Sequence, residues 1–221
     1  MNTTPELQLA LDYVRLPSAI AMALRVQEYV DVIEIGTPLI KAAGIASVAA
    51  IREVCPHKRV LADMKTPDVG ALEAAMAFDA GADIMTVIAG ASIDTVREAL
   101  AVARERSGKT VMVELTGVRD LDRIAPEWKT IGVTDLVFHR EWDAEIHGKS
   151  WTDDLLREIR GLIEMGFNVT VTGGITPGII PFFKSVPVTR FIAGRAIHAT
   201  DDPVASARAL REAIADVFGR P

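Results

Sequence analysis

The chain has 221 residues, of which 49% are hydrophobic and 24% charged, and its formal net charge at pH 7 is -6. This length suits one domain, and the composition is that of a soluble globular core. The acidic balance argues against nucleic acid and anionic membrane surfaces as partners, because basic patches bind both.

The single cysteine, Cys55, and the N-terminal residues indicate where the protein works. One cysteine can form no intramolecular disulfide and cannot build a multi-cysteine metal site, so we expect a reducing cytoplasm. The start, Met-Asn-Thr-Thr-Pro, has no basic region leading into an apolar segment. No apolar run approaches the roughly 18 residues of a membrane span. We therefore expect neither a targeting segment nor an anchor.

Short apolar runs alternate along the chain with longer segments of helical periodicity, and no linker interrupts them. The predicted strands are 7–12, 32–36, 59–64, 84–89, 110–115, 135–139, 168–172 and 190–193. The predicted helices include 17–30, 38–54, 70–79, 94–106, 153–165 and 203–218.

This alternation predicts the fold class. Strands that are almost wholly apolar suit a parallel sheet covered on both faces, with right-handed crossovers. Eight strand-helix units in this length predict a (β/α)8 TIM barrel, with residues 1–221 forming a single domain. An open doubly wound sheet usually has a Gly-rich first turn, whereas the first strand here leads into Asp12-Tyr-Val-Arg-Leu-Pro.

The run from Val60 to Asp68 ends an apolar strand in three charged groups. Side chains alternate faces along a strand, so Asp63 and Lys65 should project to the same side. Pro67 should stop ladder pairing just beyond them, and Asp68 falls on the following loop. A surface ion pair is the alternative interpretation.

Other predicted strands also end in ionisable groups, and in a barrel these ends meet at one mouth. Acids gathered around a dry cavity need positive charge among them. A lysine can supply part of it, and a divalent cation the rest. Carboxylates without a cysteine or multiple-histidine set favour Mg2+ over Zn2+. The residues are Asp12, Glu34, Asp63, Lys65, Glu114 and His139.

The last two predicted strands instead end in glycine-rich turns, Thr172-Gly173-Gly174 and Gly194-Arg195. Barrels commonly hold phosphate in the loops after strands seven and eight, where glycine lets backbone N–H groups approach the ligand. Arg195 can add a bidentate contact. Two such turns with an arginine favour phosphate binding over a merely tight turn.

Together these motifs resemble the 3-keto-L-gulonate 6-phosphate decarboxylase family of the orotidine 5'-monophosphate decarboxylase suprafamily. The resemblance runs almost end to end and in the same order. It is carried by Ala-Leu-Asp12, Ile-Glu34-Ile-Gly-Thr, Leu-Ala-Asp63-Met-Lys65-Thr-Pro-Asp68, Val-Glu114-Leu-Thr-Gly, His139-Arg, Val-Thr-Val-Thr172-Gly-Gly and Phe-Ile-Ala-Gly-Arg195.

The resemblance implies a homodimeric barrel that binds Mg2+ and a phosphorylated sugar acid. In the family's Asp-x-Lys-x-x-Asp signature, the last aspartate reaches into the neighbouring subunit's site. Glu34 and Asp63 match the metal ligands, Asp12 and Arg195 the substrate contacts, with Arg195 at the phosphate, and Lys65 and Asp68 the rest of the signature.

The implied reaction agrees with the chemistry of these residues. A β-keto acid loses CO2 when the remaining electron pair can be delocalised as an enediolate, which Mg2+ and Lys65 would stabilise. His139 is suited to relay a proton through water to the carbon that lost CO2. The product would be L-xylulose 5-phosphate. Lys65 among acids should stay protonated, so no Schiff base is expected.

One position departs from the family's pattern. The decarboxylases read His-Arg-x-Arg-Asp, whereas this chain has Trp142 in place of the second arginine, which is associated with proton delivery. The departure leaves the protonation step and the identity of the sugar acid open. The related 3-hexulose-6-phosphate synthases also lack that arginine, but they tend to have aspartate and alanine where this chain has Glu114 and Thr172.

A decarboxylase of 3-keto-L-gulonate 6-phosphate is therefore the leading prediction. The alternatives are the synthase, which joins formaldehyde to ribulose 5-phosphate, and a decarboxylase of another phosphorylated keto acid. Ribulose-phosphate 3-epimerase needs two metal-binding histidines, whereas only His139 lies at a predicted strand end. A non-catalytic phosphosugar-binding barrel would leave the charged cluster of Glu34, Asp63, Lys65 and Asp68 unexplained.

Overall fold

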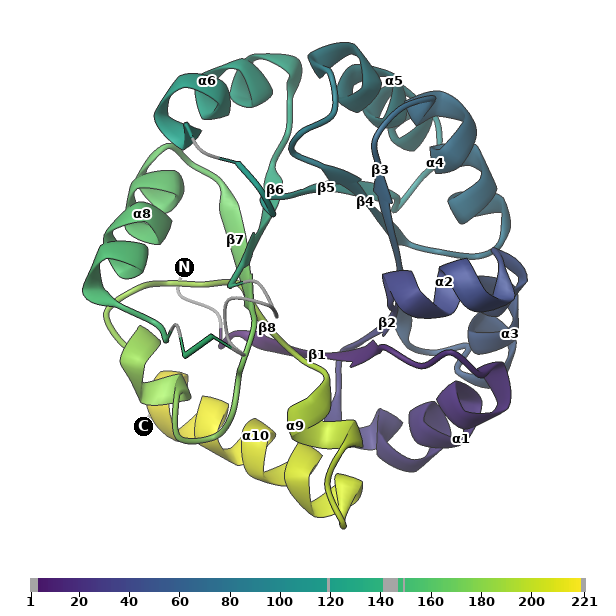
Figure 1. The fold of residues 1–221 in the computed structure, drawn as a ribbon, viewed down its shortest axis with the longest axis vertical. Helices are drawn as coiled ribbons and strands as arrows, with labels where there is room; N and C mark the ends of the chain where they lie inside the picture. The colour runs from purple at the N-terminus through teal and green to yellow at the C-terminus, as the bar shows by residue number, and fades with distance from the viewer. Residues whose placement is uncertain (1–3, 119, 141–146, 149, 220–221) are drawn as a thin grey trace.

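A computed structural model describes residues 4–118, 120–140, 147–148 and 150–219, and it has the predicted (β/α)8 architecture. The strands pair in parallel in chain order, and β8 pairs with β1 to close the barrel (Figure 1). This confirms the fold class. The strands are β1 (Glu6–Leu11), β2 (Val32–Ile35), β3 (Arg59–Thr66), β4 (Ile84–Ile88), β5 (Thr110–Glu114), β6 (Asp135–His139), β7 (Asn168–Thr172) and β8 (Arg190–Ala193).

Helices surround this ring of strands (Figure 1). They are α1 (Leu16–Val26), α2 (Thr37–Ala43), α3 (Ala46–Val54), α4 (Gly70–Asp79), α5 (Ile93–Arg104), α6 (Leu121–Ile131), α8 (Asp153–Glu164), α9 (Arg195–His198) and α10 (Pro203–Phe218).

The connections differ from the predicted helices in two places. The helix expected over 38–54 is two helices, because Gly44 ends α2 with a φ of 72° that other residues rarely adopt. The helix expected over 17–30 ends at Val26 and continues as a 3-10 turn, Gln27–Tyr29. Between β7 and β8 the helical segment is the short 3-10 turn Ile180–Phe183.

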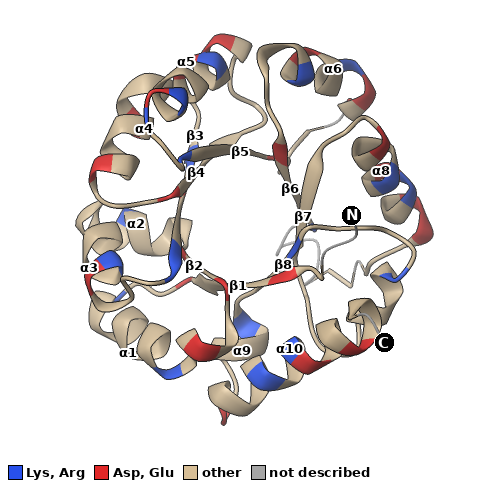
Figure 2. Ribbon diagram, turned by 180° about the vertical axis from the view of Figure 1, so that it is seen from behind, with Lys and Arg blue, Asp and Glu red and all other residues tan. Residues whose placement is uncertain are grey.

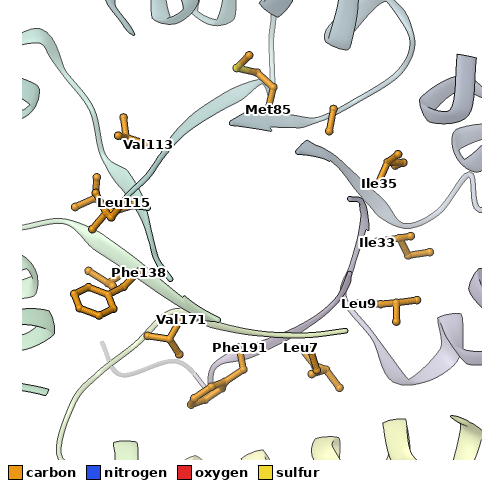
Figure 3. Packing of buried hydrophobic residues seen from close by; sticks show 14 of the residues in the cluster. Leu7, Leu9, Ile33, Ile35, Met85, Val113, Leu115, Phe138, Val171 and Phe191 are labelled. Carbon is orange, nitrogen blue, oxygen red and sulfur yellow. The ribbon is translucent and has the colours of Figure 1, made fainter. Parts of the chain in front are cut away.

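The main core lies between the barrel and its helices. In Figure 3 the labelled apolar side chains, which lie in the strands or directly after them, point outward from the ring, and all of them are buried. Burying a side chain of this size stabilises the fold by about 1.5–3 kcal/mol. The labelled residues are Leu7, Leu9, Ile33, Ile35, Met85, Val113, Leu115, Phe138, Val171 and Phe191.

A second, smaller core fills the inside of the barrel. Because strand side chains alternate, each strand that sends one residue outward sends the next inward. Beyond this inner apolar layer, the inward positions become polar at the carboxyl ends of the strands. The inner apolar residues are Ala10, Val32, Leu61, Ile84, Met112, Val137 and Ile192.

Charged residues of both signs are interspersed on the outer helices, and further charged positions lie on the strand ring (Figure 2). The strand positions matter most here, since several of them face the barrel interior. Within the described ranges, no helix combines the length and the apolar character needed to cross a membrane.

Candidate active site

A cavity of about 460 Å³ opens at the carboxyl ends of the barrel strands. It brings together side chains that lie far apart in the sequence, as barrel topology requires. The residues predicted for the site that line it are Asp12, Glu34, Asp63, Lys65, Glu114, His139, Thr172 and Arg195.

Asp63 and Lys65 form a close ion pair in this cavity, with 2.5 Å between Lys65 Nζ and Asp63 Oδ2. Regular strand alternation accounts for this pair only in part. Lys65 has a φ of 46°, and the pairing of β3 with β4 changes register between Ala62 and Thr66. Such strain persists only where surrounding contacts hold it, and it concentrates at functional sites. Here the Thr86 hydroxyl accepts a hydrogen bond from the Lys65 backbone N–H at 2.9 Å.

Hydrogen bonds to both of its oxygens hold the buried Asp63 carboxylate. Thr37 donates to Oδ2 at 2.6 Å, and Thr86 donates to Oδ1 at 2.8 Å. Burial opposes the charged form, but the Lys65 ammonium and these hydroxyls outweigh it and lower the pKa of Asp63. At Lys65, burial disfavours the charged ammonium, but the negative charges of nearby acids, Asp63 above all, outweigh this effect and raise its pKa. Both groups are therefore charged at neutral pH.

Glu34 lines the same cavity, but its surroundings favour the neutral form of its carboxyl group. Its Oε2 accepts a hydrogen bond of 2.5 Å from the Gln8 amide. Burial, followed by the negative charges of Asp63 and Asp12, raises the pKa of Glu34 well above its usual value. A carboxyl group in this state is one whose ionised form a nearby cation would stabilise strongly.

The cavity wall carries more carboxylates than cations. Within the described ranges, no group of three or more histidine, cysteine, aspartate or glutamate side chains has the spacing of a preformed metal site. Mg2+ is typically held by only one or two carboxylates, with water and substrate oxygens completing its shell. Glu34 and Asp63 fit that mode of binding, and they do not form the closed cage of a structural Zn2+ site.

Asp12 follows β1 and stands at the cavity mouth against Gly36. A Cβ added to Gly36 would lie 2.1 Å from Asp12 Oδ1, so the glycine makes room for this carboxylate. Removal from bulk water, followed by the charge of Asp63, raises the pKa of Asp12.

His139 and Glu114 form a second polar pair at the ends of β6 and β5. His139 Nδ1 lies 2.7 Å from Glu114 Oε1, and Thr116 also donates to that oxygen. Since Nδ1 of His139 is hydrogen-bonded to Glu114, the other ring nitrogen can contact a ligand or water.

A hollow of about 330 Å³ adjoins the main cavity and shares Asp12, His139, Thr172 and Arg195 with it. The predicted glycines Gly173, Gly174 and Gly194 line this hollow. Gly173 and Gly174 have φ values of 100° and 64°, which other residues rarely adopt.

The Gly173 carbonyl is held in one orientation. It accepts hydrogen bonds from Trp151 Nε1 at 2.9 Å and from Arg140 Nη2 at 3.0 Å. In a trans peptide the N–H points opposite to the C=O. These donors therefore fix the direction of the Gly174 N–H as well.

Asp68 is not among the residues that line the cavity or the hollow. It lies exposed on the loop after β3, where its Oδ1 accepts from the Val69 N–H at 2.7 Å. The neighbouring side chains of Val69, Leu72 and Met76 are 53%, 61% and 42% exposed. Trp142, the departure from the family's pattern, lies outside the described residues.

Sequence reasoning missed several residues that line the cavity or hold its acids: Gln8, Thr37, Thr86 and His198. A polar residue in an otherwise apolar strand was the available signal for Gln8 and Thr86. His198 follows the glycine turn of β8, and its ring lies 5.0 Å from that of Tyr13. Burial lowers the pKa of His198, against the opposing charge of Asp12.

Comparison with known proteins identifies the family. The model of the orotidine 5'-phosphate decarboxylase / HUMPS family matches residues 5–210. The chain belongs to this family. The resemblance inferred from the motifs is thereby confirmed.

Within the orotidine 5'-phosphate decarboxylase / HUMPS family, one close relative is 3-keto-L-gulonate-6-phosphate decarboxylase UlaD of Escherichia coli O17:K52:H18. It is 41% identical over 215 residues, which are 97% of this chain and 99% of the relative. The crystal structure of KGPDC from Streptococcus mutans in complex with D-R5P has a TM-score of 0.94 and 36% identity, covering 98% of this chain and all of that one (100%).

A 3-hexulose-6-phosphate synthase from Salmonella typhimurium has the same fold, with a TM-score of 0.89 and 33% identity over 96% of this chain and 99% of that one. The synthases are therefore related members of the same structural group, at lower identity than the decarboxylase UlaD.

Proposed function

We propose that this protein is a Mg2+-dependent carboxy-lyase that converts 3-keto-L-gulonate 6-phosphate into L-xylulose 5-phosphate and CO2. The observation that carries the proposal is the single cavity in which the Asp63–Lys65 pair, Glu34 and the Glu114–His139 pair face one another beside a glycine-lined hollow. The 41% identity to UlaD supports the choice of substrate.

Substrate phosphate would occupy the hollow. The backbone N–H groups around Gly173, Gly174 and Gly194 and the Arg195 guanidinium offer donors suited to a phosphate. Thr172 lies where the hollow meets the main cavity, so it would contact the sugar chain together with Asp12. Binding at the phosphate end fixes the keto acid with its reacting carbons over the acids and lysine.

Glu34 and Asp63 would hold the Mg2+. When bound, the ion supplies positive charge beside the ketone oxygen on which negative charge develops. Lys65 adds a second, permanently charged group at the same place. The bond to the carboxylate carbon breaks, CO2 leaves, and the bonding electron pair is delocalised into the ketone as an enediolate.

His139 would complete the reaction by delivering a proton. Its Nδ1 is bound to Glu114, which fixes the orientation of the ring, so the other nitrogen can relay a proton through water to the carbon that lost CO2. The enediolate then returns to the ketone form of the pentulose phosphate.

The proposal includes a homodimer in the cytoplasm. The exposed apolar side chains of Val69 and Leu72 beside Asp68 form a surface suited to a second copy of the chain, which would receive Asp68 in its own cavity. The lone cysteine, Cys55, is buried and fits a reducing compartment.

Hexulose phosphate synthesis is the second candidate, because Trp142 stands where the decarboxylases have arginine. Purified protein with Mg2+ should release CO2 from 3-keto-L-gulonate 6-phosphate in a coupled assay. A parallel assay follows formaldehyde condensation with ribulose 5-phosphate. Faster condensation than decarboxylation would reverse the order of the two candidates, and activity in neither would refute both.

A further inference from the structure

A chain of polar side chains runs through the barrel interior from the floor to Glu34. Arg190, at the start of β8, donates from Nη1 to Gln8 Oε1 at 3.0 Å and from Nε to Glu6 Oε2 at 3.0 Å. Gln8 in turn donates from Nε2 to Glu34 Oε2 at 2.5 Å. Gln8, Glu34 and Arg190 are 0%, 7% and 8% exposed, so water competes little for these contacts.

Stability alone does not explain an arginine at this position. Apart from its polar partners, the inward residues beside it include apolar ones, such as Met112 and Ile192. Replacing a buried ion pair by apolar side chains of similar volume is often neutral or even stabilising. A guanidinium that remains inside the barrel therefore points to a role in positioning.

Arginine can only donate hydrogen bonds, and this fixes the amide of Gln8. The oxygen of the amide must face Arg190, so the NH2 group must face Glu34. Without the guanidinium the amide could turn over and present its oxygen to the carboxylate, which would be repulsive. Among the described residues, the Gln8 amide is the donor that the structure gives to the Glu34 carboxylate.

We infer that Arg190 and Gln8 are positioning residues for the cation site, because together they hold Glu34 Oε2 in an N–H hydrogen bond and so fix the orientation of the carboxylate. The inference rests on the proposed function, since it takes Glu34 as a Mg2+ ligand. Partners that orient a metal ligand typically contribute 10- to 100-fold to metal affinity.

The test measures binding of Mn2+, a paramagnetic substitute for Mg2+, by electron paramagnetic resonance of the free ion without substrate. Gln8→Leu removes the donor to Glu34 at similar volume and should raise the Kd for Mn2+ about 10- to 100-fold. Arg190→Met should raise it about tenfold. Neither readout depends on turnover.

A double-mutant cycle separates positioning from a general effect on the fold. If Arg190 acts through Gln8, Arg190→Met should cause no further rise in Kd in the Gln8→Leu background. Arg59→Met is the matched control, because Arg59 pairs with the other oxygen of Glu6 but touches neither Gln8 nor Glu34. It should leave the Kd unchanged.

Arg190→Met proteins with wild-type Kd, or with an equal rise in Kd with and without Gln8, would overturn the inference. If Arg190→Met does not fold, Gln8→Leu carries the test, and an unchanged Kd for that variant would again overturn the inference. Wild-type protein that binds no Mn2+ would instead refute the proposed metal site itself.

Discussion

At the scale of single residues, two neighbouring acids in the cavity behave in opposite ways. Lys65 and two threonine hydroxyls lower the pKa of Asp63, whereas burial and neighbouring acids raise that of Glu34. Asp63 therefore already has its counter-charge, and Glu34 is the group with most to gain from a bound cation. This asymmetry would let the proposed site attract an ion with only two protein ligands.

Gly36 offers a test of how closely Asp12 must be placed. Gly36→Ala puts a Cβ 2.1 Å from Asp12 Oδ1, so the carboxylate must move. We expect kcat/KM to fall about 100-fold, since a misplacement of about 1 Å can cost that much. Steady-state kinetics measure the loss, and thermal unfolding verifies that the fold persists.

The control for Gly36→Ala is Gly161→Ala in helix α8, where an added Cβ meets nothing within 4 Å. It should keep full activity and gain about 0.5–1 kcal/mol of stability. Equal activity of the two variants would show that Asp12 tolerates displacement.

The charged residues of the site could be predicted because each lies at or near the carboxyl end of an apolar strand, and barrel topology then gathers them. The polar residues that hydrogen-bond to those acids could not be predicted from the sequence. Thr86 bonds Asp63 only because β4 lies beside β3 in a particular register, and Gln8 reaches Glu34 from β1. The positive φ of Lys65 could not be predicted either, since this conformation is usually signalled by a glycine and none stands there.

At the scale of elements, the segment after β6 supports the loop after β7. Trp151 packs edge-on against Phe183, with ring centroids 4.9 Å apart, and its N–H reaches the Gly173 carbonyl. Arg140, directly after β6, reaches the same carbonyl. The proposed phosphate loop is thus braced from outside the hollow, by groups that need not touch the ligand.

Trp151→Phe removes one of these braces while keeping an aromatic ring in the core. We expect KM for the phosphorylated substrate to rise about three- to tenfold, the equivalent of a hydrogen bond worth about 1 kcal/mol, with kcat little changed. Inhibition by inorganic phosphate should weaken by a similar factor.

Trp128→Phe is the matched control, because the buried Trp128 Nε1 has no hydrogen-bond partner within the described residues. It should leave KM unchanged. A rise in KM for Trp128→Phe as large as that for Trp151→Phe would contradict a specific role for the Gly173 contact.

Most elements could be predicted from periodicity, and the exceptions have local causes. The break between α2 and α3 depends on the left-handed backbone of Gly44, which a glycine inside an apolar helical run does not reveal. The segment between β7 and β8 forms only a short 3-10 turn, although it contains apolar phenylalanines. Its conformation depends on tertiary packing, because Phe183 lies against Trp151 and Phe191.

At the scale of the whole molecule, the loop carrying Asp68 is the surface that we propose for the dimer. Asp68 and Val69 lie beside Leu72, whose side chain is 61% exposed, outside the cavity of their own chain. If a second copy covers this surface, each active site takes one acid from its partner.

Mixing two inactive variants tests this shared site. Lys65→Ala and Asp68→Ala proteins should each be inactive alone. After unfolding and refolding together, a mixed dimer would contain one site with both native residues. Equal mixing should then restore about a quarter of wild-type activity. Mixtures that stay inactive, although mixed dimers form, would mean that Asp68 serves its own chain or neither.

The ion pair between Asp31 and Arg211 ties helix α10 to the barrel and should make stability depend on pH. Arg211 donates to both Asp31 oxygens, at 2.8 and 2.7 Å. Burial works against ionisation, but these bonds and the Leu7 N–H outweigh it and lower the pKa of Asp31 below 3.8. The stabilisation is thus present above pH 3.8 and is lost as pH falls through the lower folded-state value.

Asp31→Asn should therefore reduce the free energy of unfolding by about 1 kcal/mol at pH 7, allowing for partial exposure of the pair. The difference from wild type should shrink toward pH 2. Urea denaturation at several pH values measures it. Asp216→Asn, on the exposed side of α10, should differ little from wild type at any pH, and a difference for Asp31→Asn that grows in acid would contradict the argument.

The seam between β1 and β8 has a consequence for biosynthesis. Glu6 and Arg190 are register partners across it, so the first and last strands of the chain complete the ring together. In a nascent polypeptide on the ribosome, β1 cannot pair with β8 until β8 has emerged. Until then Arg190 is not available to orient the Gln8 amide. A chain interrupted during translation therefore leaves strand edges open to pairing with other chains and has no finished catalytic centre.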